Sequence, residues 1–313
     1  MLSYLHFRFY SFKIEIDLRG RSLTIKIQNH LPTGRVWDHT LSVLNARKRL
    51  GYWPNTRAPQ TFNEIILAQK SNLLTKLDLA KRLTDKLGFK EWLVDMGYPE
   101  LVVPTLAILD DIEAARSFEI LEDVVVKPTH SSGDLLVRKY SDGRNFSTKE
   151  LDMMESWLNC DYYPRSREPN YQGLQRKIIV EETLRDSSGD LPNDFKLFCY
   201  EGRVFMIQVD LGRFGVHKRQ LYTRNWDLLP YCMAYPRESE PSEKEPGLEK
   251  AIEIAEKLSE PFSFCRVDFY ILNADDLKLG EMTFFPGNGA ERFTPEGGDA
   301  MCGALMRSIK LAG

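Results

Sequence analysis

The chain has 313 residues, of which 42% are hydrophobic and 28% charged, and its formal net charge is -3. This length can bury one large core or two to three smaller ones, and the balanced charge argues against a disordered chain and a basic nucleic-acid-binding tail. The five scattered cysteines lack a CxxC spacing, so neither a disulfide framework nor a zinc site is expected. The sequence has no apolar run of about 18 residues for a transmembrane segment. We expect a cytoplasmic protein without a nucleic-acid partner.

The first 100 residues are predicted to form a hairpin followed by helices. Residues 13–27 alternate apolar and polar side chains, which indicates a short β-hairpin, although a simple N-terminal extension fits equally well. Thr61 and Glu64 form a capping box that opens a helix. A second helix is predicted at 86–96, where Gly97 ends it. This region is too helical and too short for a full Rossmann-like domain.

The remaining residues change to mixed α and β character. Apolar, β-branched runs predict short strands at 101–104, 124–127, 135–138 and 177–180. Helices are predicted at 110–116, after a second capping box at Ser147 and Glu150, and at 248–258. A hairpin is predicted over 195–209, and two more paired strands between 264 and 285. The predicted fold class is therefore α+β.

The last two strands place an acidic pair on one face of a hairpin. The runs FCRVDFYIL and LGEMTFF flank a polar turn at 273–276. A hairpin that is symmetric about this turn sets Asp268 opposite Glu281 and Arg266 opposite Thr283. The other face is then uniformly apolar and carries Cys265, Val267, Phe269, Met282 and Phe284. One face would pack in the core, and the other would present the charges.

Two carboxylates directly opposite each other repel and destabilise the strand pair. A divalent cation reverses this effect, because Mg2+ prefers oxygen ligands from one or two carboxylates together with phosphates. The pair Asp268 and Glu281 therefore predicts a metal site. The alternative is a solvated strand face on which Arg266 partly relieves an incidental acidic pair.

Two further segments have the composition of a nucleotide site. In VVVKPTHSSG, Lys127 ends a buried strand, and small residues follow whose backbone amides can approach a phosphate: Ser131, Ser132 and Gly133. In KIIVEETL, Glu181 and Glu182 end another strand, where an acidic side chain can accept from an adenine amino group. The alternatives are an exposed lysine at a strand end and a pair of solvated glutamates.

Seven segments in this order resemble the ATP-grasp superfamily, and most closely its TupA-like branch of teichuronopeptide biosynthesis. They are TFNEIILAQK, LTDKLGFKEWL, VVVKPTHSSG, IIVEETL, DFKLFCYEGRVFMIQVD, HKRQLY and RVDFYIL…GEMTFFPGNG. The resemblance implies an ATP-grasp fold, in which two α+β subdomains grip ATP. It predicts an N-terminal hairpin and helical region over 1–100, a lid subdomain with the phosphate loop over 101–190, and a C-terminal subdomain with the metal site over 191–313.

The resemblance also implies roles for the residues at the nucleotide. Lys86 and Lys127 would contact the ATP phosphates, and the loop of Ser131, Ser132 and Gly133 would cover them. Glu181 would bind the adenine amino group, and the backbone of Leu184 would complete the hinge. The implied cofactors are ATP and Mg2+.

At the reacting end, the resemblance assigns Mg2+ to Asp268 and Glu281. Many ATP-grasp ligases have Asn two residues after this Glu, but here Thr283 offers a weaker hydroxyl ligand, so a second metal stays open. Arg266 would stabilise the transferring phosphoryl group, with Lys196 in the same cleft.

Two loops are candidates for the substrate side. The PGNGAER turn offers backbone amides at Asn288 and Gly289 for a developing oxyanion, although its glycines could serve the turn alone. The basic segment His217, Lys218 and Arg219 is a candidate for binding a phosphate or an acidic substrate, with an exposed basic loop as the alternative.

The resemblance implies a carboxylate–amine ligase that uses ATP to form an amide through an acylphosphate. The branch points to attachment of an amino acid to a uronic-acid-containing cell-surface polysaccharide or its precursor. The partners would be ATP and a small-molecule or saccharide substrate with a carboxylate. A kinase for a sugar or small molecule, and a non-catalytic nucleotide-binding protein of polysaccharide biosynthesis, are the alternatives.

Overall fold

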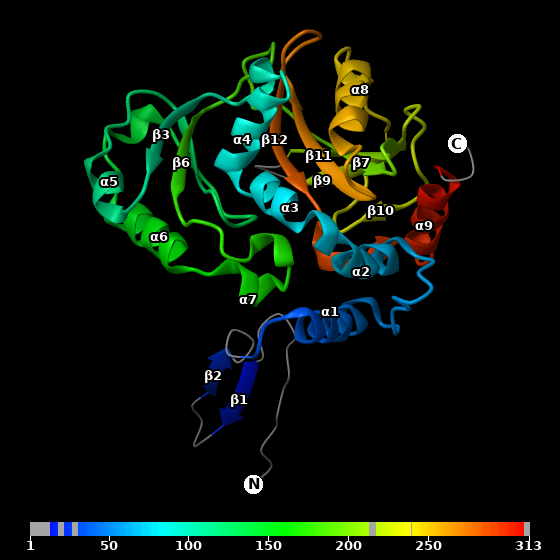
Figure 1. Ribbon diagram of the computed structural model, residues 1–313. Helices are drawn as coiled ribbons and strands as arrows, with labels where there is room; N and C mark the ends of the chain where they lie inside the picture. Colours follow the sequence, from blue (N-terminus) through cyan, green and yellow to red (C-terminus); the bar gives the residue numbers. More distant parts are fainter. Residues whose placement is uncertain (1–12, 18–21, 27–30, 213–216, 239, 310–313) are drawn as a thin grey trace.

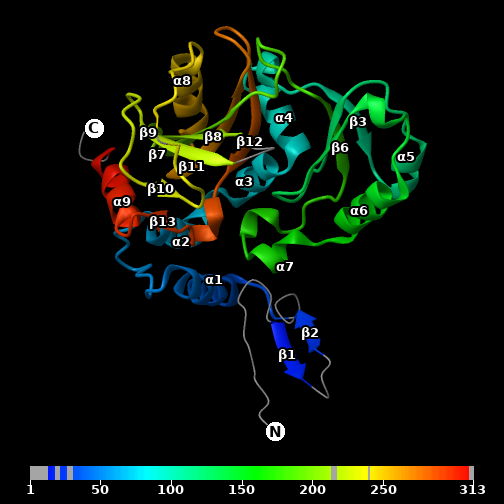
Figure 2. The ribbon, with the colours of Figure 1, turned by 180° about the vertical axis from the view of Figure 1, so that it is seen from behind.

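The computed structural model describes residues 13–17, 22–26, 31–212, 217–238 and 240–309. Two β-sheets form separate lobes (Figure 1), and helices α3 (Leu77–Thr84) and α4 (Lys86–Asp95) lie between them. Helix α1 (Arg35–Leu50) lies below the lobe of the larger, five-stranded sheet, as the view from behind also shows (Figure 2). The fold is α+β, with helices in the N-terminal region, as the sequence predicts.

The predicted N-terminal hairpin and helices are present. Strands β1 (Lys13–Asp17) and β2 (Ser22–Lys26) pair antiparallel, and the turn that joins them lies outside the described residues. Helix α2 (Phe62–Asn72) begins at the predicted capping box, in which Thr61 accepts from the backbone N–H of Glu64. The hairpin prediction and the capping prediction are both confirmed.

The smaller sheet has four antiparallel strands in the order β3-β6-β4-β5. They are β3 (Thr105–Leu109), β4 (Val124–Pro128), β5 (Leu136–Arg138) and β6 (Ile178–Glu182). Helices α5 (Ile112–Ser117) and α6 (Thr148–Asn159) share an apolar core with this sheet. The strand predicted at 101–104 is wrong. Pro99 opens a 3-10 turn there, and Pro104 has no N–H for a ladder, so the strand begins at Thr105.

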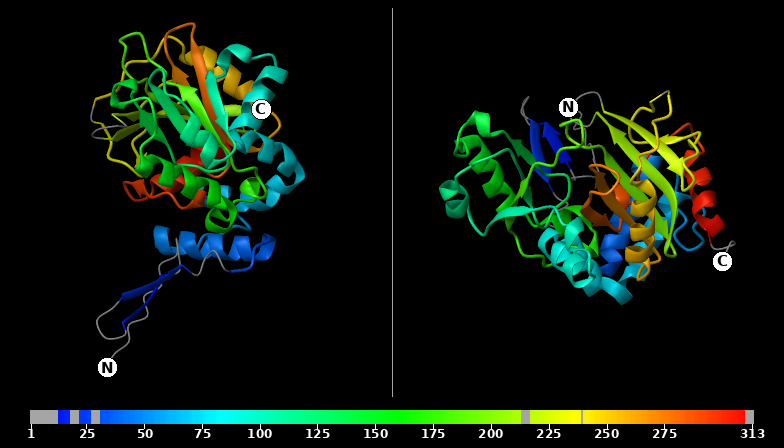
Figure 3. Two further views of the ribbon diagram at one scale, coloured as in Figure 1. Left: turned by 90° about the vertical axis from the view of Figure 1, so that its left-hand side faces the viewer. Right: turned by 90° about the horizontal axis from the view of Figure 1, so that it is seen from above.

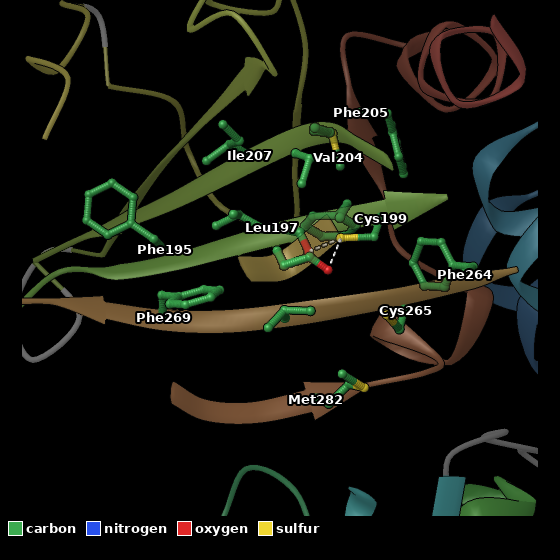
Figure 4. Close-up of a cluster of buried hydrophobic side chains, with 14 of the residues drawn as sticks. Phe195, Leu197, Cys199, Val204, Phe205, Ile207, Phe264, Cys265, Phe269 and Met282 are labelled. Carbon is green, nitrogen blue, oxygen red and sulfur yellow. Dashed lines mark hydrogen bonds between the residues drawn. The ribbon is translucent and has the colours of Figure 1, made fainter. Parts of the chain in front are cut away.

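The larger sheet has five antiparallel strands in the order β12-β11-β7-β8-β9. They are β7 (Asp194–Tyr200), β8 (Arg203–Leu211), β9 (Lys218–Thr223), β11 (Phe264–Ile271) and β12 (Leu277–Thr283). Helix α8 (Leu248–Ser259) packs on the face that carries Leu197, Cys199 and Cys265, all fully buried (Figure 4). The apolar face predicted for the last hairpin is therefore confirmed.

The N-terminal helices belong to the core of this larger sheet. Phe62 of α2 packs edge-on against Phe198 and Phe264 on the face opposite α8. Gln69 donates to the backbone carbonyl of Phe264 at 2.7 Å. These helices cover only part of that face. The view from above shows the two sheets as two lobes (Figure 3), and polar side chains lie along β7 and β11.

The hairpin of β11 and β12 has the predicted register at the acidic pair. Asp268 lies opposite Glu281, and Arg266 lies opposite Thr283. Closer to the turn the register differs by one residue, because the ladder shifts at a bulge after Asp268 and Gly280 has no partner in it. Without this bulge, the register near the turn would set Asp268 opposite Gly280.

Four further elements complete the described chain: α7 (Tyr162–Ser166), β10 (Cys232–Met233), β13 (Phe293–Thr294) and α9 (Gly298–Ser308). Single 3-10 turns lie at Leu73–Lys76, Pro99–Leu101, Tyr140–Asp142, Pro169–Tyr171 and Pro286–Gly289. In the part of the chain that the structure describes, no helix combines the length and apolarity needed to cross a bilayer.

Candidate functional site

Two adjoining cavities lie where the smaller and larger sheets face each other. The apolar cavity, of about 440 Å³, has in its wall charged residues that include Lys127 and Glu181, together with six aliphatic side chains: Val103, Val125, Leu135, Val137, Leu184 and Leu191. The charged cavity, of about 470 Å³, is lined by basic and acidic side chains that include Lys86, Lys127, Lys196, Arg219, Arg266, Asp268 and Glu281. Residues common to both walls are Lys127, Leu135, Asp194, Asp210 and Tyr270. The two cavities therefore form one continuous cleft.

Asp268 is held by two cations on the wall of the charged cavity. Arg266 donates to both of its carboxylate oxygens at 2.6 Å, and Lys196, directly opposite on β7, donates at 2.9 Å. Burial raises the pKa of Asp268, but Arg266 and Lys196 outweigh it and hold the pKa below its usual value. The carboxylate is therefore ionised at neutral pH.

The guanidinium of Arg266 also joins the other two residues of the predicted metal site. It lies 3.4 Å from a carboxylate oxygen of Glu281 and donates to the Thr283 hydroxyl at 3.0 Å. Asp268 is 4% exposed in its side chain, and Glu281 is 37% exposed. Arg266 thus relieves the repulsion within the acidic pair, and Glu281 remains open to the cavity.

The acidic pair offers a divalent cation two carboxylates on the wall of the charged cavity. Among the described residues, no group of three or more His, Cys, Asp or Glu side chains is arranged to hold a metal. Mg2+ typically takes one or two carboxylates and completes its shell with phosphate oxygens and water. Asp268 and Glu281 fit that requirement when a polyphosphate fills the cavity. They do not form a closed protein site.

The predicted phosphate loop forms one edge of the charged cavity. Ser132 and Gly133 line it, and Gly133 has a φ of +86°, which favours glycine. Ser131 is buried, and its hydroxyl donates to Asp134 at 3.1 Å. Lys86, in the first turn of α4, donates to the backbone carbonyl of Ser131 at 2.7 Å. The loop is therefore tied to α4 through one of the predicted phosphate ligands.

Glu181 lies between two lysines rather than facing solvent. Its two oxygens lie 2.6 Å from Lys127 Nζ and 2.5 Å from Lys90 Nζ. No local pattern marks Lys90, because a lysine in a helix is usually exposed and the sequence does not show that α4 brings it to Glu181 on β6. Glu181 and Leu184 both line the apolar cavity, as the predicted hinge requires.

The side chains of the basic segment at the start of β9 lie on two different faces of the sheet. His217 and Arg219 line the charged cavity, whereas Lys218 pairs with Glu238 at 2.6 Å, because successive strand residues alternate. Arg219 donates to both oxygens of the buried Asp210 at 2.6 and 3.1 Å. The charge of Arg219 is therefore largely compensated within the protein.

The turn after β12 lies outside both cavity linings. Asn288 donates to the Ser166 carbonyl at 2.6 Å and accepts from Lys70. Gly289 has a φ of +66°, and a Cβ there would lie 2.7 Å from the side chain of Leu67. Gly287 also has a positive φ, of +53°. The glycines of this turn thus have a conformational and packing reason of their own.

Comparison with solved structures gives matches of low similarity. The ATP-grasp ligase PsnB with a minimal precursor is 14% identical, with a TM-score of 0.39, over 75% of this chain and 63% of that one. D-alanine–D-alanine ligase from Bacillus anthracis with ATP is 13% identical, with a TM-score of 0.36, over 66% and 54%. L-amino acid ligase from Bacillus licheniformis is 13% identical, with a TM-score of 0.40, over 80% and 50%. The chain thus spans less than two thirds of each of these proteins.

No curated protein matches the chain. A family model described as TupA-like ATPgrasp matches residues 66–307, which is most of the chain and includes every residue that lines the two cavities. The acidic pair, the phosphate loop and the hinge all lie within the matched residues. The chain belongs to the TupA-like ATP-grasp family.

Proposed function

We propose that this protein is a carboxylate–amine ligase that uses ATP and Mg2+ in the cytoplasm. The observation that carries the proposal is the continuous cleft, in which an apolar cavity opens into a charged one. Ligand pockets are typically roughly 300–1,000 Å³ and mostly apolar, with a few polar groups that fix orientation. A nucleoside fits the apolar cavity, and a polyphosphate suits the lysines and arginines beside it. Membership of the ATP-grasp family supports the same assignment.

The nucleotide would lie along the cleft between the two sheets. Its adenine would occupy the apolar cavity, beside Glu181 and the backbone of Leu184. Lys127 lines both cavities and would reach the phosphates, together with Lys86. The loop of Ser131, Ser132 and Gly133 would cover them, because its small residues let backbone amides come close to an anion.

At the reacting end, Asp268 and Glu281 would hold Mg2+, with Thr283 beside them. The metal would neutralise charge on the phosphates when bound. Arg266 and Lys196 are held in place by Asp268, and Lys196 also by Asp194, so both cations are oriented before the nucleotide binds. Such preorganised charge is the main requirement of phosphoryl transfer, which needs no protein nucleophile.

The proposed reaction has two steps. An oxygen of the substrate carboxylate attacks the γ-phosphorus of ATP, and ADP leaves. The nitrogen of the amine then attacks the carbonyl carbon of the acylphosphate and releases inorganic phosphate, which leaves an amide. Of the substrate-side candidates we retain His217, which lines the charged cavity.

For the substrates, we propose an amino acid as one partner and a uronic acid of a cell-surface polysaccharide or its precursor as the other. The support for this choice is the TupA-like branch alone. Of the basic side chains in the charged cavity, His217 and Arg219 are not assigned to the nucleotide, and we expect the substrate carboxylate to lie beside His217.

The test is a screen of ADP and phosphate release with Mg2+, in which amino acids are combined with uronic acids and sugar nucleotides. A ligase releases one ADP and one phosphate for each amide formed, and product formation needs both substrates. ADP release with a phosphorylated product and no free phosphate would show a kinase instead. No ATP turnover with any pair would favour a non-catalytic binding protein.

A further inference from the structure

Lys90 of α4 belongs to a buried row of three charges that begins at the wall of the cleft with Lys127 and Glu181 and ends behind it at Lys90. Its Nζ lies 2.5 Å from one oxygen of Glu181, and Lys127 Nζ lies 2.6 Å from the other. The side chains of Lys90, Glu181 and Lys127 are 12%, 4% and 16% exposed. The carboxylate therefore lies between two ammonium groups with little solvent to screen them.

Lys90 is engaged by the protein on all sides. Besides Glu181, it donates to the Val103 carbonyl at 2.7 Å and to the Thr105 hydroxyl at 2.8 Å. An ammonium has three N–H donors, so each donor of Lys90 has a partner. Lys90 is not among the residues that line either cavity. A ligand in the cleft would not touch it.

In contrast to Lys90, Lys127 can contact a ligand in the cleft, because it lines both cavities. Glu181 is the only ion-pair partner of Lys127 among the described residues. A lysine and a glutamate alone would form a neutral pair whose attraction for an anion is weak. The second cation, on the far oxygen of the carboxylate, gives the row a net charge of +1.

We propose that Lys90 is a positioning residue for the nucleotide phosphates. The positive charge of Lys90 neutralises the negative charge of Glu181. Glu181 can then hold Lys127 in position, and the positive charge of Lys127 still attracts a phosphate in the cleft. The inference deepens the proposed function and rests on it, since it requires nucleotide phosphates beside Lys127.

The protonation states agree with this arrangement. Burial raises the pKa of Glu181, but Lys127 and Lys90 outweigh it, and the pKa lies below its usual value. Burial lowers the pKa of Lys127, but Glu181 outweighs it, and the pKa lies above its usual value. Burial lowers the pKa of Lys90, and Glu181 offsets part of that effect.

The experiment is calorimetric titration of ATP and of adenosine into the full chain and its variants. The ratio of the adenosine and ATP dissociation constants measures what the phosphates contribute. Lys90→Met should lower this ratio by about tenfold or more, because the row becomes neutral. Adenosine binding should change less than about twofold. Lys257→Met, on the exposed side of α8 beside Glu260, is the control and should leave the ratio unchanged.

The double variant Lys90→Met/Glu181→Gln separates charge from packing. It removes the charges of Lys90 and Glu181 and keeps the positive charge of Lys127. The ratio of the adenosine and ATP dissociation constants should therefore return to the wild-type value or above it. An unchanged ratio in Lys90→Met, or a loss that the double variant does not restore, would overturn the inference.

If Lys90→Met alone does not fold, as judged by circular dichroism, the ratio must still fall from Glu181→Gln to the double variant, and equal ratios would overturn the inference. If the wild-type protein binds neither ligand, the proposed function fails and the inference fails with it. ATP binding by the wild type with an unaffected Lys90→Met ratio contradicts the inference alone.

Discussion

At the scale of single residues, carboxylates in the wall of the charged cavity hold its basic side chains in place. Asp268 fixes Arg266 and Lys196, and Asp210 fixes Arg219. Each pair costs desolvation on folding, and a pair buried in this way is weak evidence for stability. Its value here would be preorganisation, because cations that are already oriented need not rearrange when a polyphosphate enters.

The first prediction concerns Lys127. Lys127→Ala should weaken ATP binding by about tenfold or more, since a charge-assisted hydrogen bond is worth roughly 1.5–3 kcal/mol. The fold should persist, because Lys90 still compensates Glu181 in the variant. Calorimetry measures the affinity, and Lys257→Ala is the control. Unchanged ATP affinity would remove Lys127 from the phosphate site.

The second prediction concerns a buried acid outside the cleft. Glu168 is 9% exposed, and burial raises its pKa to about 7, against the opposing attraction of Lys70. An acid whose folded pKa is raised holds extra protons in the folded state. Its contribution to stability is therefore present below its unfolded pKa of 4.5 and is lost as the pH rises to about 7.

Glu168→Gln should remove this dependence on pH. The free energy of unfolding of the wild type, relative to that of the variant, should fall by on the order of 2 kcal/mol between pH 5 and pH 7.5. Urea unfolding at the two pH values measures it, and the comparison cancels groups that titrate in both proteins and do not interact with Glu168. Parallel pH profiles would show that the pKa of Glu168 is not raised.

At the scale of elements, the hairpin of β11 and β12 shows what a local pattern can and cannot predict. Alternation and the turn at 273–276 predicted the pairing of Asp268 with Glu281, which is confirmed. The bulge at Gly280 was not predicted, although it reconciles the register at the turn with the register at the acidic pair. One glycine in a strand is only a weak sign of a bulge.

The third prediction concerns the glycine at this bulge. A Cβ at Gly280 would lie 3.0 Å from the ring of Tyr270, which lines both cavities. Gly280→Val should therefore lower the free energy of unfolding by about 1–3 kcal/mol and weaken ATP binding. In a Tyr270→Leu background, Gly280→Val should lower the free energy of unfolding by a smaller amount. An equal cost in both backgrounds would show that the contact with Tyr270 is not the cause.

The pairing of β7 with β11 could not be predicted from the sequence. Lys196 is directly opposite Asp268, but the two residues are 72 positions apart and no hairpin joins their strands. The contact between Lys90 of α4 and Glu181 of β6 could not be predicted either, because it forms only when the helix packs in the folded protein. Local patterns thus predicted many of the strands but missed β3 and β9, and tertiary packing decides which charges meet.

At the scale of the whole molecule, the cleft lies between two sheets that have separate cores. The α+β class, the helical N-terminal region and the family could be predicted, because capping boxes, strand alternation and family motifs are local. That α2 shares its core with the larger sheet was not predictable, since a helix pattern shows that a face is buried but not what covers it.

The fourth prediction follows from ligand linkage. A ligand that binds the folded chain alone stabilises it by about 2.7 kcal/mol at 100 times its dissociation constant. ATP with Mg2+ should therefore raise the melting temperature in a concentration-dependent manner, as measured by differential scanning fluorimetry. The rise should be smaller in Lys127→Ala at the same ATP concentration. Equal shifts in both proteins would show that the stabilising ligand lies elsewhere.

The central claim is that Asp268 and Glu281 bind Mg2+ together with ATP in the cleft. The most direct test is titration of ATP into the wild type and into Glu281→Gln, each with Mg2+ and with EDTA. The wild type should bind ATP at least about tenfold more tightly with Mg2+, and Glu281→Gln should lose most of that difference. An absence of ATP binding by the wild type, or the same Mg2+ dependence in both proteins, would contradict the claim.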